Sequence, residues 1–128
     1  MRVLGIDPGS QTMGWGVVEG DSRRYSLIAF GAVRAPSSLS FPTRLLRMCT
    51  GLEEVIAEHR PDACVLEDAF LATNVKVSMK LGQVRGVVLL VARPLSVHLS
   101  LTPLRVPWRA KPRRRMRTRR AVASRPPK

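Results

Sequence analysis

The sequence predicts one α/β domain followed by a basic tail, and three observations support this prediction. Apolar runs closed by glycine, proline or aspartate indicate strands within residues 2–35. Two longer segments repeat apolar side chains every three or four positions, which indicates helices. From Arg93 onward, prolines and arginines interrupt every such period. A chain of 128 residues has room for one hydrophobic core rather than two domains.

Three strands are expected in the N-terminal part of the chain. The sequence RVLGID (2–7) is a short apolar run that a Pro-Gly-Ser turn closes. Residues 14–20 and 24–35 have the composition of a second and a third strand. Because only a short polar turn joins these two, their pairing is expected to be antiparallel.

A helix and a fourth strand are expected next. Residues 41–59 carry apolar side chains at helical spacing, with Ser40 as the N-cap and Pro42 in the first turn. The run DACVLEDAF (62–70) predicts a strand whose continuous apolar centre is typical of burial on both faces. A strand that returns through a helix is the natural parallel neighbour of the first strand, so we expect a mixed sheet with flanking helices.

A second helix is expected after the LATN loop, with Thr73 or Asn74 as its cap and an end near Ala92. Gly82 and Gly86 share one face of it, and each costs about 1 kcal/mol relative to alanine in a helix. A close approach to another backbone would explain the pair, and poor helix design is the alternative. The apolar positions that define this helix are Val77, Leu81, Val84, Val88 and Val91.

Charge is distributed very unevenly. The chain has 22 basic and 9 acidic residues, and every acid lies at or before Asp68. This imbalance favours a polyanionic partner. Residues 93–128 contain 12 of the basic residues and 6 of the 10 prolines, so no packed element is expected there. We therefore expect an ordered domain over residues 1–92 and a disordered Arg/Pro-rich tail over residues 93–128.

Cysteine usage and hydropathy predict the compartment. Cys49 and Cys64 lack the spacing of a zinc site and are expected to be buried thiols in a reducing cytosol. The longest apolar run, residues 87–92, is far shorter than the roughly 20 residues of a membrane span. A cytoplasmic protein with no membrane partner is expected.

Two carboxylates follow the two strands expected to be parallel. Asp7 ends the first strand and Glu67 comes at the end of the fourth. Sites in sheets of this kind lie beyond the carboxyl ends of the parallel strands. Adjacent carboxylates repel unless a cation or a shared proton intervenes, and a hard divalent ion such as Mg²⁺ is the expected solution. The alternative is an Asx-type turn at Asp7 and a solvated strand end at Glu67.

Three blocks of the sequence resemble one known family. LGIDPGS with GWGV, VLEDAF with ATN, and KLGQVRG are similar to the blocks of RuvC-type Holliday-junction resolvases, in the same order, over residues 1–92. The resemblance implies a ribonuclease H-like fold and a homodimer that nicks four-way DNA junctions in recombination and repair. It also implies Mg²⁺ as cofactor, with Mn²⁺ as a possible substitute, and the branch-migration complex as a partner.

The resemblance also implies roles for individual residues. Asp7 and Glu67 match the first two metal-binding catalytic acids of the family, and Phe70 matches an aromatic that contacts bases at the opened junction. For Phe70 a core position is the alternative, and for the basic residues a solvated helix face. The residues that would serve DNA phosphates are Lys76, Lys80 and Arg85.

The chain also departs from that family. Family members continue with another strand and a late helix that carries Asp-x-x-Asp or Asp-x-x-His, whereas this sequence has no acid after Asp68. We therefore expect a C-terminally incomplete fold whose fourth strand is an open edge, and impaired cleavage. His98 does not supply this motif, because no acidic residue accompanies it.

Three interpretations follow from these observations. The first is a junction-resolvase homologue whose activity is doubtful. The second is a non-enzymatic basic DNA-binding protein that uses residues 93–128 as an arm. The third is a change of reading frame near codon 92 that replaced the native C-terminal third with an out-of-frame tail.

Overall fold

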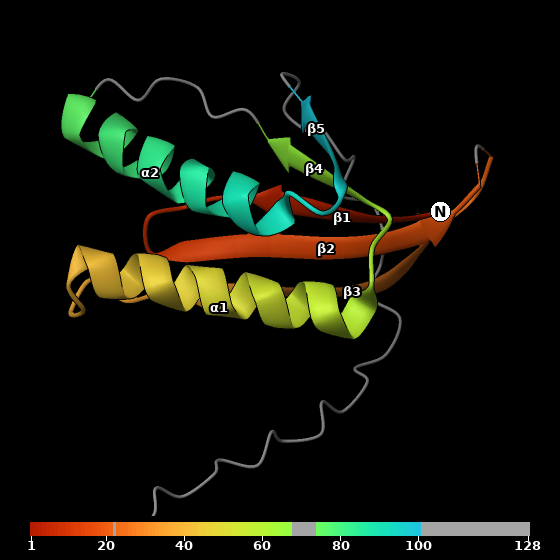
Figure 1. Cartoon of the computed structure of the whole chain (residues 1–128), viewed down its shortest axis with the longest axis horizontal. Coiled ribbons are helices and arrows are strands. Elements are labelled where there is room, and N and C mark those ends of the chain that lie inside the picture. Colours follow the sequence, from red (N-terminus) through yellow and green to blue (C-terminus); the bar gives the residue numbers. More distant parts are fainter. Residues whose placement is uncertain (22, 68–73, 101–128) are drawn as a thin grey trace, which may run out of the picture.

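A computed structural model describes residues 1–21, 23–67 and 74–100 as one five-stranded sheet with two helices (Figure 1). The strands lie in the order β3-β2-β1-β4-β5. The elements are β1 (Arg2–Asp7), β2 (Thr12–Gly20), β3 (Tyr25–Arg34), α1 (Phe41–His59), β4 (Ala63–Glu67), α2 (Val75–Ala92) and β5 (Ser96–Ser100).

The pairing of the strands confirms the predicted mixed sheet. β1 pairs antiparallel with β2, and β2 pairs antiparallel with β3. β1 and β4 are parallel, with Leu4 opposite Cys64 and Ile6 opposite Leu66. In the tight β1–β2 turn, a Cβ at Gly9 would lie 2.3 Å from the carbonyl oxygen of Thr12, so only glycine fits there.

Both helices begin at the predicted caps. The Ser40 hydroxyl accepts a hydrogen bond from the Thr43 amide at the start of α1. α1 ends at Arg60, whose left-handed φ of 47° lets its amide bond the Ile56 carbonyl oxygen. At α2, Asn74 rather than Thr73 is the cap, because its side-chain oxygen accepts from two helix amides.

The core lies between the sheet and the two helices, which cover the same face (Figure 1). Strand side chains alternate between the faces, so every second residue of β1, β2 and β4 enters this core. The largest fully buried residues that share it are Leu4, Met13, Val17, Met48, Leu52, Cys64, Leu66, Val84 and Val88.

The opposite face of the sheet is only partly covered by the residues that the structure describes. Val3, Gly5 and Val65 alternate with buried neighbours and remain half-exposed. On the edge strand β3, Phe30 is 74% exposed. This face therefore presents a shallow apolar surface, and the two strand-end carboxylates lie along it.

β5 corrects one expectation from the sequence. No packed element was expected after Arg93, and β4 was expected to be an open edge. Instead, β5 pairs parallel with β4 from Ala63↔Ser96 to Glu67↔Ser100, while Leu95 and Val97 pack against the core. The two flanking prolines were read as breakers, yet they bound a stretch that alternates apolar and polar residues, LSVHLSL, which is the period of a strand.

Both cysteines are free, as expected, with Cys64 fully buried and Cys49 half-buried. Burial raises the pKa of the Cys64 thiol to about 11. Within the described ranges, neither helix is long and apolar enough to span a membrane.

Candidate active site

The two predicted carboxylates lie side by side at one end of the sheet. Ile6 is opposite Leu66 in the parallel β1–β4 pair, and Asp7 and Glu67 are the next residue of each strand. Asp7 is exposed and Glu67 is half-buried. The parallel register is what brings together two side chains separated by 60 positions in the sequence.

Both carboxylates open onto one trough on the less covered face of the sheet. This trough has a volume of about 700 Å³, and its lining includes four glycines, Gly5, Gly14, Gly16 and Gly31, besides larger apolar strand residues such as Trp15 and Val65. A Cβ at Gly14 would lie 3.8 Å from the Cβ of Asp7, in ordinary contact with it, so glycine there leaves the space next to the Asp7 side chain open. The glycines thus leave room beside Asp7 and Glu67 for a bulky ligand.

The acidic pair is not part of a larger ligand cluster in the described ranges. These ranges contain no group of three or more His, Cys, Asp or Glu side chains that could hold a metal ion. His98 lies on β5 opposite Val65, two residues before the level of Glu67. The chemistry of the described site therefore rests on two carboxylates.

The loop that follows Asp7 is anchored by a buried arginine that sequence reasoning missed. Arg44 of α1 is 6% exposed, and its Nη1 donates a 2.7 Å hydrogen bond to the carbonyl oxygen of Ser10. Its Cζ lies 5.0 Å from the centroid of the Phe41 ring, a cation–π contact. The available signal was the spacing of Arg44 from Met48 and Leu52, which places a cation on the buried face of an amphipathic helix.

The basic residues of α2 have different environments. Lys76 and Lys80 are exposed, and Nζ of Lys80 lies 5.7 Å from the Phe41 ring centroid. Arg85 is half-buried, and its Nη1 donates a hydrogen bond to the backbone carbonyl of Glu67. Arg85 therefore holds the end of β4, next to the Glu67 carboxylate. Phe70, Asp68 and Thr73 lie outside the described residues.

A mixed sheet in the order β3-β2-β1-β4-β5, with paired carboxylates at the carboxyl ends of its parallel strands, defines a ribonuclease H-like fold. The chain belongs to the family of crossover junction endodeoxyribonuclease RuvC, which its sequence matches over residues 3–106. The match continues past residue 92, where the resemblance drawn from the motifs ended.

Individual relatives agree with this assignment. The chain is 44% identical over 105 residues to the crossover junction endodeoxyribonuclease RuvC of Rubrobacter xylanophilus, covering 81% of this chain and 59% of that protein. It is 48% identical over 89 residues to the RuvC of Chlorobium chlorochromatii, covering 70% of this chain and 46% of that protein. The structure of T. thermophilus RuvC in complex with a Holliday junction substrate superposes with a TM-score of 0.73 at 27% identity, covering 78% of this chain and 65% of that one.

The matched region is thus one part of a longer family architecture. The chain spans about half the length of the curated relatives it matches.

Proposed function

We propose that this chain binds four-way DNA junctions and contributes two carboxylates to the metal-dependent nuclease centre of a Holliday-junction resolvase. The observation that carries the proposal is the juxtaposition of Asp7 and Glu67 at the carboxyl ends of parallel strands, on a trough whose lining includes four glycines. The named T. thermophilus relative, solved with a Holliday junction, supports the choice of substrate.

The donor set at this site suits a hard divalent cation. Both side chains offer carboxylate oxygens, the ligands that Mg²⁺ prefers, and Mn²⁺ is a chemically reasonable substitute. Asp7 and Glu67 would hold the ion. When bound, a divalent ion of this kind activates water and stabilises charge on the oxygens of a phosphodiester. The exposed Asp7 is proposed to face the DNA backbone, while half-buried Glu67 has less freedom to move.

Two carboxylates form an incomplete coordination shell. Residues 69–128 contain 15 basic residues and no acid, so they offer no further carboxylate. Mg²⁺ keeps water in open positions, so weak binding is expected to survive. Efficient cleavage needs ions fixed to within about 0.5 Å. We therefore propose that the 128-residue polypeptide by itself cleaves junctions poorly or not at all.

DNA contacts are assigned to the helix beside this site. Lys76 and Lys80 are exposed on α2 and are proposed to contact phosphates, which positions DNA without reading its sequence. Arg85 is proposed to add to this positive surface while it holds the Glu67 carbonyl. Phe70 is proposed to stack on a base at the opened junction, since base stacking on an aromatic ring tolerates any sequence.

A second copy of the chain is proposed to pack on α2. Gly82 and Gly86 have no atom within 4 Å of an added Cβ, so the close approach that explains them is not made within the described part of this chain. Met79 and Leu90 flank them with exposed fractions of 62% and 63%. Small residues between exposed apolar ones, at intervals of three and four, fit a helix–helix seam. A homodimer is also the form in which two such sites would nick a junction symmetrically, and we further propose the branch-migration complex as its partner.

The deciding experiment compares two polypeptides on a synthetic four-way junction with Mg²⁺ or Mn²⁺. One is the chain as given, and the other carries the C-terminal third read from an alternative frame of the gene. Since β5 and the family match continue past residue 92, we propose testing for a change of frame after residue 106 rather than near codon 92. An Asp-x-x-Asp or Asp-x-x-His in that alternative frame is expected.

The outcomes separate the three interpretations. Symmetric nicking by the restored polypeptide alone, abolished by Asp7→Asn or Glu67→Gln, supports the proposal. Nicking by the chain as given would refute the claim that two carboxylates are insufficient. Junction binding without nicking in either polypeptide would favour a non-enzymatic DNA-binding protein, which the 15 unopposed basic residues of 69–128 also allow.

A further inference from the structure

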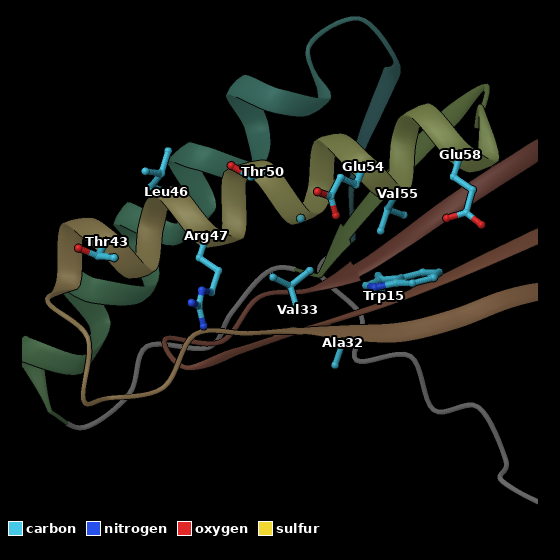
Figure 2. Close-up of a pocket in the computed structure, with 11 residues that line it drawn as sticks. Trp15, Ala32, Val33, Thr43, Leu46, Arg47, Thr50, Glu54, Val55 and Glu58 are labelled. Atoms are coloured by element: carbon cyan, nitrogen blue, oxygen red, sulfur yellow. The ribbon is translucent and has the colours of Figure 1, made fainter. Parts of the chain in front are cut away.

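A groove runs between α1 and the edge strand β3 (Figure 2), and neither Asp7 nor Glu67 lines it. Its volume is about 650 Å³. Trp15, Val33 and Val55 form an apolar floor, and the Trp15 ring lies 5.5 Å from the imidazole of His59. A Cβ at Gly31 would lie 2.8 Å from Cζ2 of Trp15, so the strand passes directly beside the indole.

One wall of the groove is a polar stripe along α1. The side chains on it recur every three or four positions, and all five are exposed: Thr43, Arg47, Thr50, Glu54 and Glu58. In Figure 2, Arg47, Glu54 and Glu58 extend from the helix on the side of the strand. Among the described residues, Glu54 has no ion pair, and Glu58 has only a 3.9 Å contact with Nε2 of His59. One end of the stripe is therefore acidic in a chain with a net charge of +13.

The other wall of the groove is the outer edge of the sheet. β3 is ten residues long and has a neighbour on one side only in the described sheet. Its backbone amides and carbonyls on the outer side are a template for another strand. Four large apolar side chains remain exposed on it: Tyr25 (60%), Leu27 (62%), Ile28 (43%) and Phe30 (74%). An edge this long and apolar favours strand addition by a partner.

We propose that the groove binds an extended segment of a partner protein, which pairs with β3 as a sixth strand. Two basic side chains of this segment, two residues apart (i and i+2), then face Glu54 and Glu58. Residues four apart on a helix are about 6 Å apart along its axis. Side chains i and i+2 of a strand are about 6.6 Å apart and point to the same side. The two spacings match, so one segment can satisfy both carboxylates. Its alternate side chains then cover Phe30 on the other face.

The groove lies apart from the carboxylate pair: among the described residues, Trp15 is the one that lines both the groove and the trough. The chemistry selects a partner segment of alternating basic and apolar residues. A second copy of the chain pairing through β3 is the other occupant that an apolar edge allows, and the experiment below distinguishes it.

The test uses the full chain with Trp108→Phe, so that Trp15 is the only indole. The probe is the capped peptide TVKVKVT, and the matched peptides are TVEVEVT and TVKPKVT. Saturable change in Trp15 emission is expected with the lysine peptide alone, because glutamates repel the stripe and proline breaks the pairing. Amide exchange in β3 is expected to slow in the complex.

Matched variants on one helix complete the design. Glu54→Gln and Glu58→Gln are each expected to weaken binding of TVKVKVT about twofold to fivefold, as exposed ion pairs do. Glu53→Gln removes the same charge outside the groove and is expected to leave binding unchanged.

Three results would overturn the proposal. The first is absence of saturable binding by TVKVKVT, and the second is equal weakening by all three glutamine variants. The third is self-association that survives Gly82→Ala/Gly86→Ala on α2 but is abolished by Phe30→Lys, which would assign the edge to a second copy.

Discussion

Replacing Gly31 with alanine is expected to destabilise the fold, whereas the same change at Gly16 is not. A Cβ at Gly31 would meet Cζ2, Cε2 and Nε1 of Trp15 at 2.8, 3.0 and 3.3 Å. A Cβ at Gly16 would meet nothing nearer than 4.0 Å. Both glycines lie in the same antiparallel ladder. Alanine restricts the unfolded chain at either position, and this unfolded-state gain stabilises both variants by about 0.4–1 kcal/mol.

The added Cβ would contact ring atoms of the indole, so the contact is relieved only if the whole ring shifts. Overpacking of this kind costs about 1–3 kcal/mol, which leaves Gly31→Ala less stable by roughly 1–2 kcal/mol after the unfolded-state gain. Gly16→Ala is expected to be neutral or slightly stabilising. Since 1 kcal/mol changes Tm by roughly 4–8 °C in a domain of this size, the two variants should differ by at least about 5 °C.

The measurement is thermal and urea unfolding followed by the emission of Trp15 in a Trp108→Phe background. Gly31→Ala is also expected to alter the native emission spectrum, because the indole shifts against His59. Equal stability of the two variants, or an unchanged spectrum in Gly31→Ala, would refute the packing of Trp15 against β3 described above.

Three further predictions concern the buried thiol, the tail and α2. Burial raises the folded-state pKa of Cys64 to about 11 from an ordinary 9.0. Its contribution to stability is therefore present below pH 9 and disappears as the pH rises toward 11. In urea titrations, the difference in unfolding free energy between the chain and Cys64→Ala should shrink over that pH range. Deleting residues 101–128 keeps β5 and should lower the slope of log K against log [salt] for duplex DNA. The expected decrease is about 0.9 for each phosphate that the deleted residues neutralise. An unchanged slope would exclude residues 101–128 from DNA binding. Alanine at both Gly82 and Gly86 should stabilise the monomer by about 1 kcal/mol each and yet weaken the dimer at least tenfold in sedimentation equilibrium, whereas Gln83→Ala should leave the dimer intact.

Most of the fold could be predicted because local signals agreed with the tertiary structure. The boundaries of β1 and α1 follow from a turn and from two caps, which are short-range features. The parallel pairing of β1 with β4 follows from the helix between them. β5 was missed because prolines were weighed above the alternation from Leu95 to Leu101, although a strand paired on one side tolerates proline at its ends.

The candidate site was only partly accessible from the sequence. The proximity of Asp7 and Glu67 could be predicted because each ends a strand, and a strand end can be recognised from the neighbouring sequence. The contacts of Arg44 and Arg85 could not be predicted, because each joins a helix side chain to a backbone carbonyl far away in sequence. Backbone carbonyls are present at every residue, so no side-chain pattern marks which one an arginine will find. The groove beside Trp15 likewise depends on how closely α1 approaches β3.

Two arginines hold the strand ends that carry the carboxylate pair. Arg44 of α1 holds the loop after Asp7 through Ser10, and Arg85 of α2 holds the strand end at Glu67. Each carboxylate-bearing strand end is thus fixed by a cation from a different helix, and the two helices pack on each other over the same face of the sheet. The parallel register of β1 and β4 brings the carboxylates together, and both arginine contacts that hold the strand ends are made within residues 1–92. A restored C-terminal third would need only to add ligands to a pair that is already in place.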